Sequence, residues 1–123
     1  VIIGKHRSAS LSAAVCKAAS GAAELLPVAK VTNLTAAIEA LKKRNVWVVA
    51  ADADAPPADA VNLTGAIALV VGAEGDGLSR LVLESCDLKA SIPMKGKTGS
   101  LNAAVAAAVL MYEKVRQDSA KGC

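Results

Sequence analysis

Three short segments in the C-terminal half of the chain carry residue types that could build a ligand site. They read VGAEGDGL at 71–78, SIPM at 91–94 and SLNAAV at 100–105. Each places a glycine, a proline or a small polar residue where a strand is expected to end or a helix to begin. Open α/β sheets bind their ligands at the carboxyl ends of strands. We therefore expect the three turns to meet at one sheet edge and to enclose a pocket.

The glycine-rich turn Gly72–Gly77 has several possible uses. Glycines permit positive φ angles and let backbone amides approach a ligand closely. The spacing is not that of a dinucleotide fingerprint, G-x-G-x-x-G, and the acidic Glu74 and Asp76 would repel a pyrophosphate. A purely structural alternative stays open, in which Glu74 or Asp76 caps the following helix. Taken singly, Pro93 could simply end a strand and Ser100 could simply be an N-cap.

Length and composition point to one soluble domain. A chain of 123 residues is long enough for a single core. Its longest apolar run, Ala103–Met111, is far shorter than the ~20 residues of a membrane span. The chain starts directly in an apolar strand without an initiator methionine and shows no secretion signal. We expect a cytoplasmic protein with no membrane contact.

Cysteine, histidine and charge restrict the site chemistry. The three cysteines, Cys16, Cys86 and Cys123, are scattered, which argues against a disulfide framework or a zinc site. With His6 as the single histidine, we expect no metal. The net charge is +3, with basic clusters at 5–7, 42–44 and 95–97. These clusters could meet phosphate or could be ordinary solvated ends, so charge permits a nucleic-acid partner without showing one.

Strand and helix patterns alternate along the chain, which predicts a parallel α/β sheet flanked by helices. The strand 46–50 is apolar on both faces, as a central parallel strand should be. A polar loop follows it. The expected strands cover 1–3, 28–32, 46–50, 67–71 and 88–92, and the expected helices 8–20 (ended by Gly21), 33–44 (capped by Asn33), a short one from about 78, and 100–117.

The last expected helix is apolar nearly all round. Leu101, Val105, Ala108 and Tyr112 share one face, and Leu110 lies on another. Such a helix needs cover on more than one side. We expect a homodimer through this C-terminal helix; the alternative is cover by other parts of the same chain.

Taken together, these segments resemble the SpoU (TrmH-like) RNA ribose 2′-O-methyltransferases of the SPOUT superfamily. The resemblance covers essentially the whole chain. An upstream part, including KHRSA at 5–9 and VTNL at 31–34, is similar to the branch that methylates a guanosine of 23S ribosomal RNA. The motifs are GAEGDGLSR at 72–80, CD at 86–87, SIPM at 91–94, GSLN at 99–102 and YE at 112–113.

The resemblance implies a C-terminal trefoil knot that holds S-adenosylmethionine largely through backbone groups. It also implies an RNA partner, ribosomal RNA above all, and methyl transfer to a ribose 2′-hydroxyl. The residues that it implies for cofactor binding are Gly72, Gly77, Ile92, Met94 and Leu101. Those that it implies for the catalytic pocket are Glu74, Ser100 and Asn102.

One part of the family pattern has no match here. Family members carry an upstream motif with an asparagine and an arginine, the arginine acting on the 2′-hydroxyl, and this chain starts at what resembles the following strand. We therefore expect residues 1–123 to be an N-terminally truncated catalytic domain that lacks the first strand and helix. Two rival functions stay open: a non-catalytic RNA- or ribosome-binding module that kept the fold, and a generic nucleotide-binding α/β domain.

Overall fold

The computed structural model describes residues 1–4, 20, 22–72, 78–96 and 102–121, which fall into two compact units, Val1–Ala37 and Ile38–Cys123. In the first unit, β1 (Ile2–Gly4) and β2 (Ala29–Val31) pair in parallel, which confirms both expected strands. The short helix α2 (Ala22–Leu25) precedes β2 and was not expected. Of the helix expected over 8–20, residues 8–19 lie outside the described residues, and Ser20 lies in a turn with a φ of 52°.

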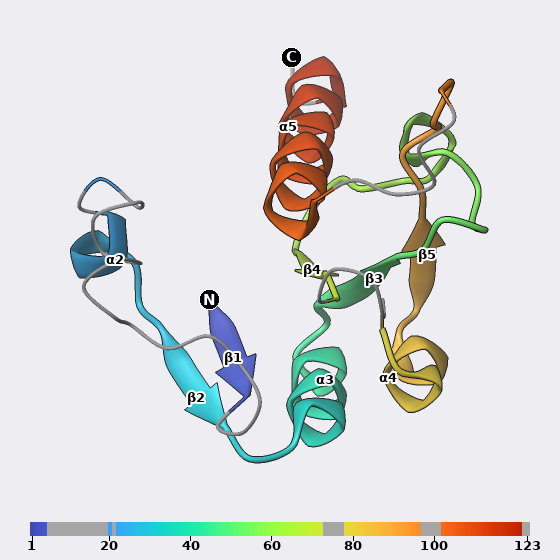
Figure 1. Cartoon of the computed structure of the whole chain (residues 1–123). Coiled ribbons are helices and arrows are strands. Elements are labelled where there is room, and N and C mark those ends of the chain that lie inside the picture. Colours follow the sequence, from blue (N-terminus) through green and yellow to red (C-terminus); the bar gives the residue numbers. More distant parts are fainter. Residues whose placement is uncertain (5–19, 21, 73–77, 97–101, 122–123) are drawn as a thin grey trace. The chain divides into compact units, whose positions relative to one another are not determined.

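The second unit contains a parallel three-stranded sheet in the order β4–β3–β5 (Figure 1). The strands are β3 (Trp47–Ala51), β4 (Ile67–Val70) and β5 (Leu88–Ala90). Val48 and Val49 in β3 are fully buried although they point to opposite faces. The predicted parallel pairing and the central position of the strand at 46–50 are therefore confirmed, whereas the five expected strands form a two-stranded and a three-stranded sheet instead of one.

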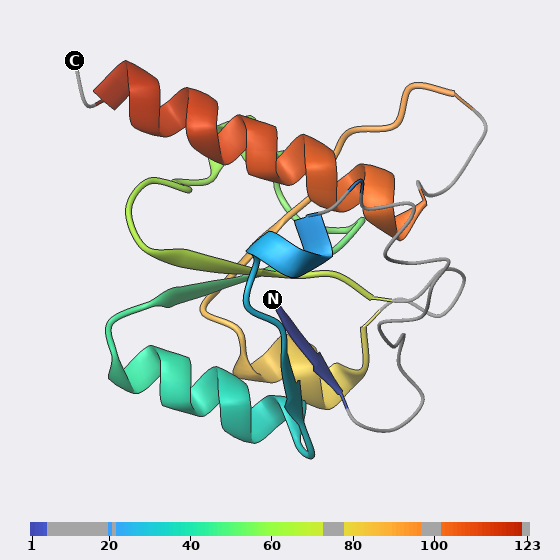
Figure 2. The same cartoon turned by 90° about the vertical axis from the view of Figure 1, so that its left-hand side faces the viewer.

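Helices cover both faces of this sheet (Figure 2). On one face Val48 packs with Ile38 of α3 (Leu34–Lys43) and Val82 of α4 (Arg80–Ser85). On the other face Val49 packs in a cluster with Leu110 of α5 (Ala103–Lys121). None of the described helices is long and apolar enough to cross a membrane.

The ends of α3 and α4 follow local sequence signals. Asn33 caps α3 as expected, since its Oδ1 accepts the Ala36 N–H at 3.2 Å. Asn45 follows α3 with a left-handed φ of 63°, a conformation that asparagine tolerates after a helix. The cap of α4 is Ser79, which accepts the Val82 N–H. The alternative in which Glu74 or Asp76 caps this helix is therefore wrong, and the helix begins at Arg80 rather than near 78.

Helix α5 begins and ends later than expected. Its N-cap is Asn102, whose Oδ1 accepts the backbone N–H groups of Ala104 at 2.8 Å and Val105 at 3.4 Å. The helix therefore starts at Ala103 rather than near Ser100. It continues past Gln117 to Lys121 because Asp118 and Lys121 bond the chain just before β4.

The connection between β3 and β4 was expected to be a polar loop, and it is only partly so. It contains the short helix η1 (Ala58–Ala60), and both Ala58 and Leu63 are buried in the cluster beneath α5. It also runs along the end of β5. The Asp52 N–H donates to Ala90 O at 3.0 Å, and the Ala58 N–H donates to Ser91 O at 2.8 Å.

Candidate functional site

Two of the three expected turns follow strands that end side by side with β3. The register aligns Val70 of β4 with Ala50, and Ala90 of β5 with Ala51. Two inter-strand spacings therefore separate the strand ends, about 10 Å. Gly72 and Ile92 each come two residues after their strand, so both lie at this sheet edge.

The amino end of α5 lies toward the same edge. The carboxyl half of α5 bonds Leu63 and Gly65, which precede β4, so the helix runs antiparallel to that strand (Figure 2). Its first residues are thereby directed toward the end of β4. This places Asn102 toward the same end of the sheet as Gly72 and Ile92, the end where the strands finish.

The described site residues differ in exposure. Ile92 is half-buried and packs against the cluster around Val49 and Leu110, so its position is fixed by the core. Gly72 is half-buried, whereas Met94 and Asn102 are exposed. The other predicted site residues, Glu74, Gly77, Ser100 and Leu101, lie outside the described part of the chain.

Ser91 anchors the turn that follows β5. Its N–H donates to Pro56 O and its Oγ to Ala55 O, both at 2.8 Å, and its side chain is buried. All three hydrogen-bonding groups of Ser91 are thus occupied by the segment 55–58. The turn Ile92–Met94 therefore begins at a residue whose position is fixed by hydrogen bonds. Its apolar side chains lie at the carboxyl end of the sheet.

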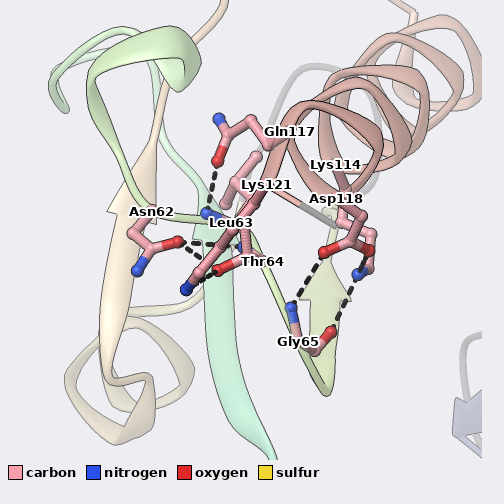
Figure 3. Close-up of polar contacts among 8 residues, drawn as sticks. All are labelled: Asn62, Leu63, Thr64, Gly65, Lys114, Gln117, Asp118 and Lys121. Carbon is pink, nitrogen blue, oxygen red and sulfur yellow. Dashed lines mark hydrogen bonds and ion pairs between the residues drawn. The ribbon is translucent and has the colours of Figure 1, made fainter. Parts of the chain in front are cut away.

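Polar residues on the inward side of α5 were missed by the sequence reasoning. Gln117, Asp118 and Lys114 bind the connection before β4 (Figure 3). The sequence signal for these contacts is the spacing of the three polar residues at i, i+3 and i+4, on the same helix face as Leu110.

Two acids on α5 have lowered pKa values. Hydrogen bonds from Arg116 and then Gln117 lower the pKa of Glu113 from its ordinary value of 4.5 to about 2. The Lys114 ammonium and the Gly65 N–H lower the pKa of Asp118. Both carboxylates therefore stay ionised at neutral pH, as their hydrogen bonds require.

The other groups singled out by sequence serve local structure. Lys42 donates to Ser85 O at 3.2 Å and lies 4.0 Å from Asp87, so this member of the basic cluster 42–44 is engaged within the chain. Burial raises the pKa of the half-buried Cys86 thiol, which suits a structural residue. Within the described ranges, no three His, Cys, Asp or Glu side chains gather to hold a metal.

Residues 1–112 match the sequence model of the SpoU rRNA methylase family. The chain belongs to this family. The match confirms the family resemblance drawn from the three C-terminal motifs.

Relatives and solved structures agree with this membership of the SpoU family. The 23S rRNA (guanosine-2′-O-)-methyltransferase RlmB of Pectobacterium atrosepticum is 50% identical over 119 residues, which are 95% of this chain and 48% of that protein. The Yersinia pestis protein of the same name is 48% identical over 123 residues, 98% of this chain and 50% of its own length. The chain thus spans about half the length of these curated relatives.

A solved structure supports the fold. The SpoU methyltransferase AviRb from Streptomyces viridochromogenes, in complex with the cofactor AdoMet, superposes with a TM-score of 0.85 at 29% identity. The match covers 94% of this chain and 48% of that one.

The described residues at the carboxyl end of this SpoU sheet suit an adenosyl group. Gly72 offers backbone groups without a side chain, while Ile92 and Met94 offer apolar surface. Small-molecule sites combine such apolar lining with a few backbone donors and acceptors. Among the residues that the structure describes, no carboxylates or imidazoles cluster as a cation needs. The described residues therefore fit the cofactor of the solved SpoU relative.

Proposed function

We propose that this chain binds S-adenosylmethionine and carries the site at which an RNA ribose 2′-hydroxyl, most specifically on a guanosine of 23S rRNA, is methylated. The observation that carries the proposal is that Gly72 and Ile92 follow the carboxyl ends of strands on either side of β3, with the start of α5 directed toward the same end of the sheet. The names of the 23S rRNA methyltransferase relatives and the cofactor bound to AviRb support it.

Different residues are proposed to hold the cofactor and to organise the chemistry. When bound, the cofactor supplies an electrophilic sulfonium methyl group. The ribose hydroxyl is a weak nucleophile, so the pocket must orient it in line with that methyl group and accept its proton. Gly72, Gly77, Ile92, Met94 and Leu101 are proposed to bind the cofactor, and Glu74, Ser100 and Asn102 to organise the hydroxyl.

We also infer a knotted chain, from the path of the β3–β4 connection. In a strand, the backbone N–H and C=O groups of successive residues point to opposite sides of the strand. The β3–β4 connection makes hydrogen bonds on both sides of the chain at the end of β5. Asp52 bonds Ala90 on the β3 side, whereas Pro56 and Ala58 bond Ser91 on the other side. Gln117 of α5 donates to Ala58 O and Val61 O of the same connection. This arrangement supports a chain that passes from β5 to α5 through the loop.

The outward face of α5 supports the proposed homodimer. Val105, Met111, Tyr112 and Val115 are all exposed, Tyr112 by 75%. The inward face is the one that contains Leu110. Clustered exposed apolar side chains of this kind mark interaction surfaces. A second copy of the chain is the proposed occupant. A cytoplasmic location is also proposed, and the proposed RNA-modifying role supports it.

Calorimetry with S-adenosylmethionine and its demethylated product tests the cofactor proposal. Gly72→Val should abolish binding because its side chain fills the space that the backbone needs at the ligand. Gly96→Val is the matched control, because a Cβ at Gly96 meets nothing within 4 Å. Binding of NAD or ATP in place of S-adenosylmethionine would instead identify a generic nucleotide-binding domain.

Transfer of a tritiated methyl group to unmodified ribosomal RNA tests the reaction. Label on a guanosine 2′-oxygen is the expected result. A protein that binds the cofactor and the RNA but never transfers label would be the non-catalytic binding module.

A further inference from the structure

Within the part of the chain that the structure describes, the amino half of helix α5 faces the sheet with small apolar side chains. Leu110 is its one described residue in the buried class, at 1% exposure, and the inward positions before it are the half-buried alanines 103, 106 and 107. Apolar contacts of this kind are non-directional. They hold the helix near the sheet without fixing its rotation or its register along the strands.

Directional contacts come from the carboxyl half of the helix, where the side-chain amide of Gln117 acts beside Lys114, Asp118 and Lys121. Gln117 Oε1 accepts the Leu63 N–H at 2.8 Å (Figure 3). Its Nε2 donates to Val61 O at 3.0 Å and to Ala58 O at 3.2 Å. One orientation of the amide satisfies all three partners, since the reversed amide would set oxygen against carbonyl oxygens. Glu113 Oε1, held by Arg116, lies 3.2 Å from the same Nε2 and shares its two hydrogens with the two carbonyl oxygens, which also favours this orientation.

The same contact reaches the turn after β5. Ala58, whose carbonyl binds Gln117, donates its N–H to Ser91 O at 2.8 Å. Ser91 directly precedes Ile92. A short path of hydrogen bonds therefore joins α5 to the start of the Ile92–Met94 turn.

We propose that Gln117 is a positioning residue of the methyl-transfer site. By fixing α5 on Ala58, it sets the separation and angle between Asn102 at the start of the helix and Ile92 at the end of β5. The helix transmits this constraint over 15 residues, about 22 Å. The inference rests on the proposed function, in which Ile92 contacts the cofactor and Asn102 the reacting hydroxyl.

Four variants of the full chain isolate the amide contact. Gln117→Glu keeps the shape but turns an oxygen toward two carbonyls and Glu113, and Gln117→Met keeps the length without polar groups. Ala120→Glu adds the same charge at an exposed position of α5. Ile38→Ala lowers stability from the opposite face of the sheet. If Gln117→Glu does not fold, Gln117→Asn, which keeps the amide on a shorter stem, replaces it.

Calorimetry with S-adenosylmethionine is the first measurement. We expect both Gln117 variants to weaken binding about tenfold or more, as loose support of a site does. The matched controls are Ala120→Glu and Ile38→Ala, whose affinities for S-adenosylmethionine should stay within about threefold of wild type. Wild-type affinity in the Gln117 variants, or an equal loss in Ile38→Ala at matched stability, would overturn the inference.

Amide hydrogen exchange separates this inference from the proposed function. If the wild-type chain binds no S-adenosylmethionine, the proposed function fails, and exchange alone decides the role of Gln117. The amides of Ala104 and Val105, which donate to Asn102, should lose about tenfold in protection in Gln117→Glu but not in Ile38→Ala. Unchanged protection at these remote amides would show that Gln117 acts only locally.

Discussion

Asn102 joins helix capping to the proposed chemistry in a single side chain. Its Oδ1 accepts two backbone N–H groups at the start of α5. A cap of this kind stabilises a helix by about 1 kcal/mol, so loss of the side chain affects folding as well as any catalytic contact. The two roles separate only if a substitution keeps the cap and removes the amide.

Asn102→Ser is that substitution, and Asn102→Ala is its control. Serine retains a capping oxygen, so the free energy of unfolding of Asn102→Ser should stay within about 0.3 kcal/mol of wild type. That of Asn102→Ala should be lower by about 1 kcal/mol. Both should lose methyl transfer by about 10²-fold while cofactor binding changes little. Urea denaturation and tritium transfer measure the two effects. Full transfer activity in Asn102→Ser would assign the residue to capping alone.

The carboxylates of Glu113 and Asp118 make the attachment of α5 sensitive to acid. Their pKa values are lower in the folded chain than in the unfolded chain, that of Glu113 at about 2 against 4.5. Such groups stabilise the fold above the unfolded pKa, and the contribution disappears as pH falls toward the folded pKa. Stability should therefore decrease as the pH falls from about 5 to about 2.

Glu113→Gln tests the source of this dependence. It removes a titrating group, so its free energy of unfolding should fall less steeply than that of wild type over the same pH range. Chemical denaturation at several pH values gives the two slopes. Parallel curves would place the acid sensitivity in other carboxylates.

At the scale of elements, the two faces of α5 make different contacts. The inward face binds the β3–β4 connection through Gln117 and Asp118, while the outward face exposes Val105 and Tyr112. A standard stable interface buries about 800 Å² on each partner. An apolar helix face can contribute a large part of that area.

Tyr112→Glu should therefore dissociate the proposed dimer. A carboxylate placed in an apolar interface must lose its water without gaining a partner. In a symmetric dimer this happens on both chains, at a cost of roughly several kcal/mol. Sedimentation should show wild type and Ala120→Glu as dimers and Tyr112→Glu as a monomer. A monomeric wild type at micromolar concentration would contradict the interface.

The sequence predicted the elements better than their ends. The strands at 46–50, 67–71 and 88–92 were recognisable because their apolar residues form short runs between turn residues. The end of α5 depends on contacts that Gln117 and Asp118 make with residues more than fifty positions earlier. Local patterns carry no information about such contacts, so the helix was expected to stop too early.

The same reason explains what was missed in the candidate site. Motif residues such as Gly72 and Ile92 were found from their positions after strands. The burial of Leu63 and the role of Gln117 were not, because a polar loop and a polar helix position become a buried contact only when the two meet. The sequence thus indicated residues of the proposed site but not the contacts that hold them in position.

At the scale of the whole molecule, the proposed knot limits how the chain can fold. The loop made by β3 and the connection to β4 has roughly 20 residues, so its perimeter is at most about 70 Å and its width about 22 Å. A folded domain of about 100 residues has a radius of gyration of about 13 Å and is therefore wider than this loop. An unfolded C-terminal segment passes easily, whereas a folded domain attached to it does not.

Fusing a stable small domain to Cys123 should therefore slow refolding from denaturant, whereas the same domain fused to Val1 should not. The C-terminal fusion must wait for the loop to open wide, while the N-terminal fusion leaves the threading end free. Refolding followed by Trp47 fluorescence, with the unfused chain as reference, measures the three rates. Equal rates would mean that no end passes through a loop, and the path around Ser91 would then be a simple wrap of the connection over the edge of β5.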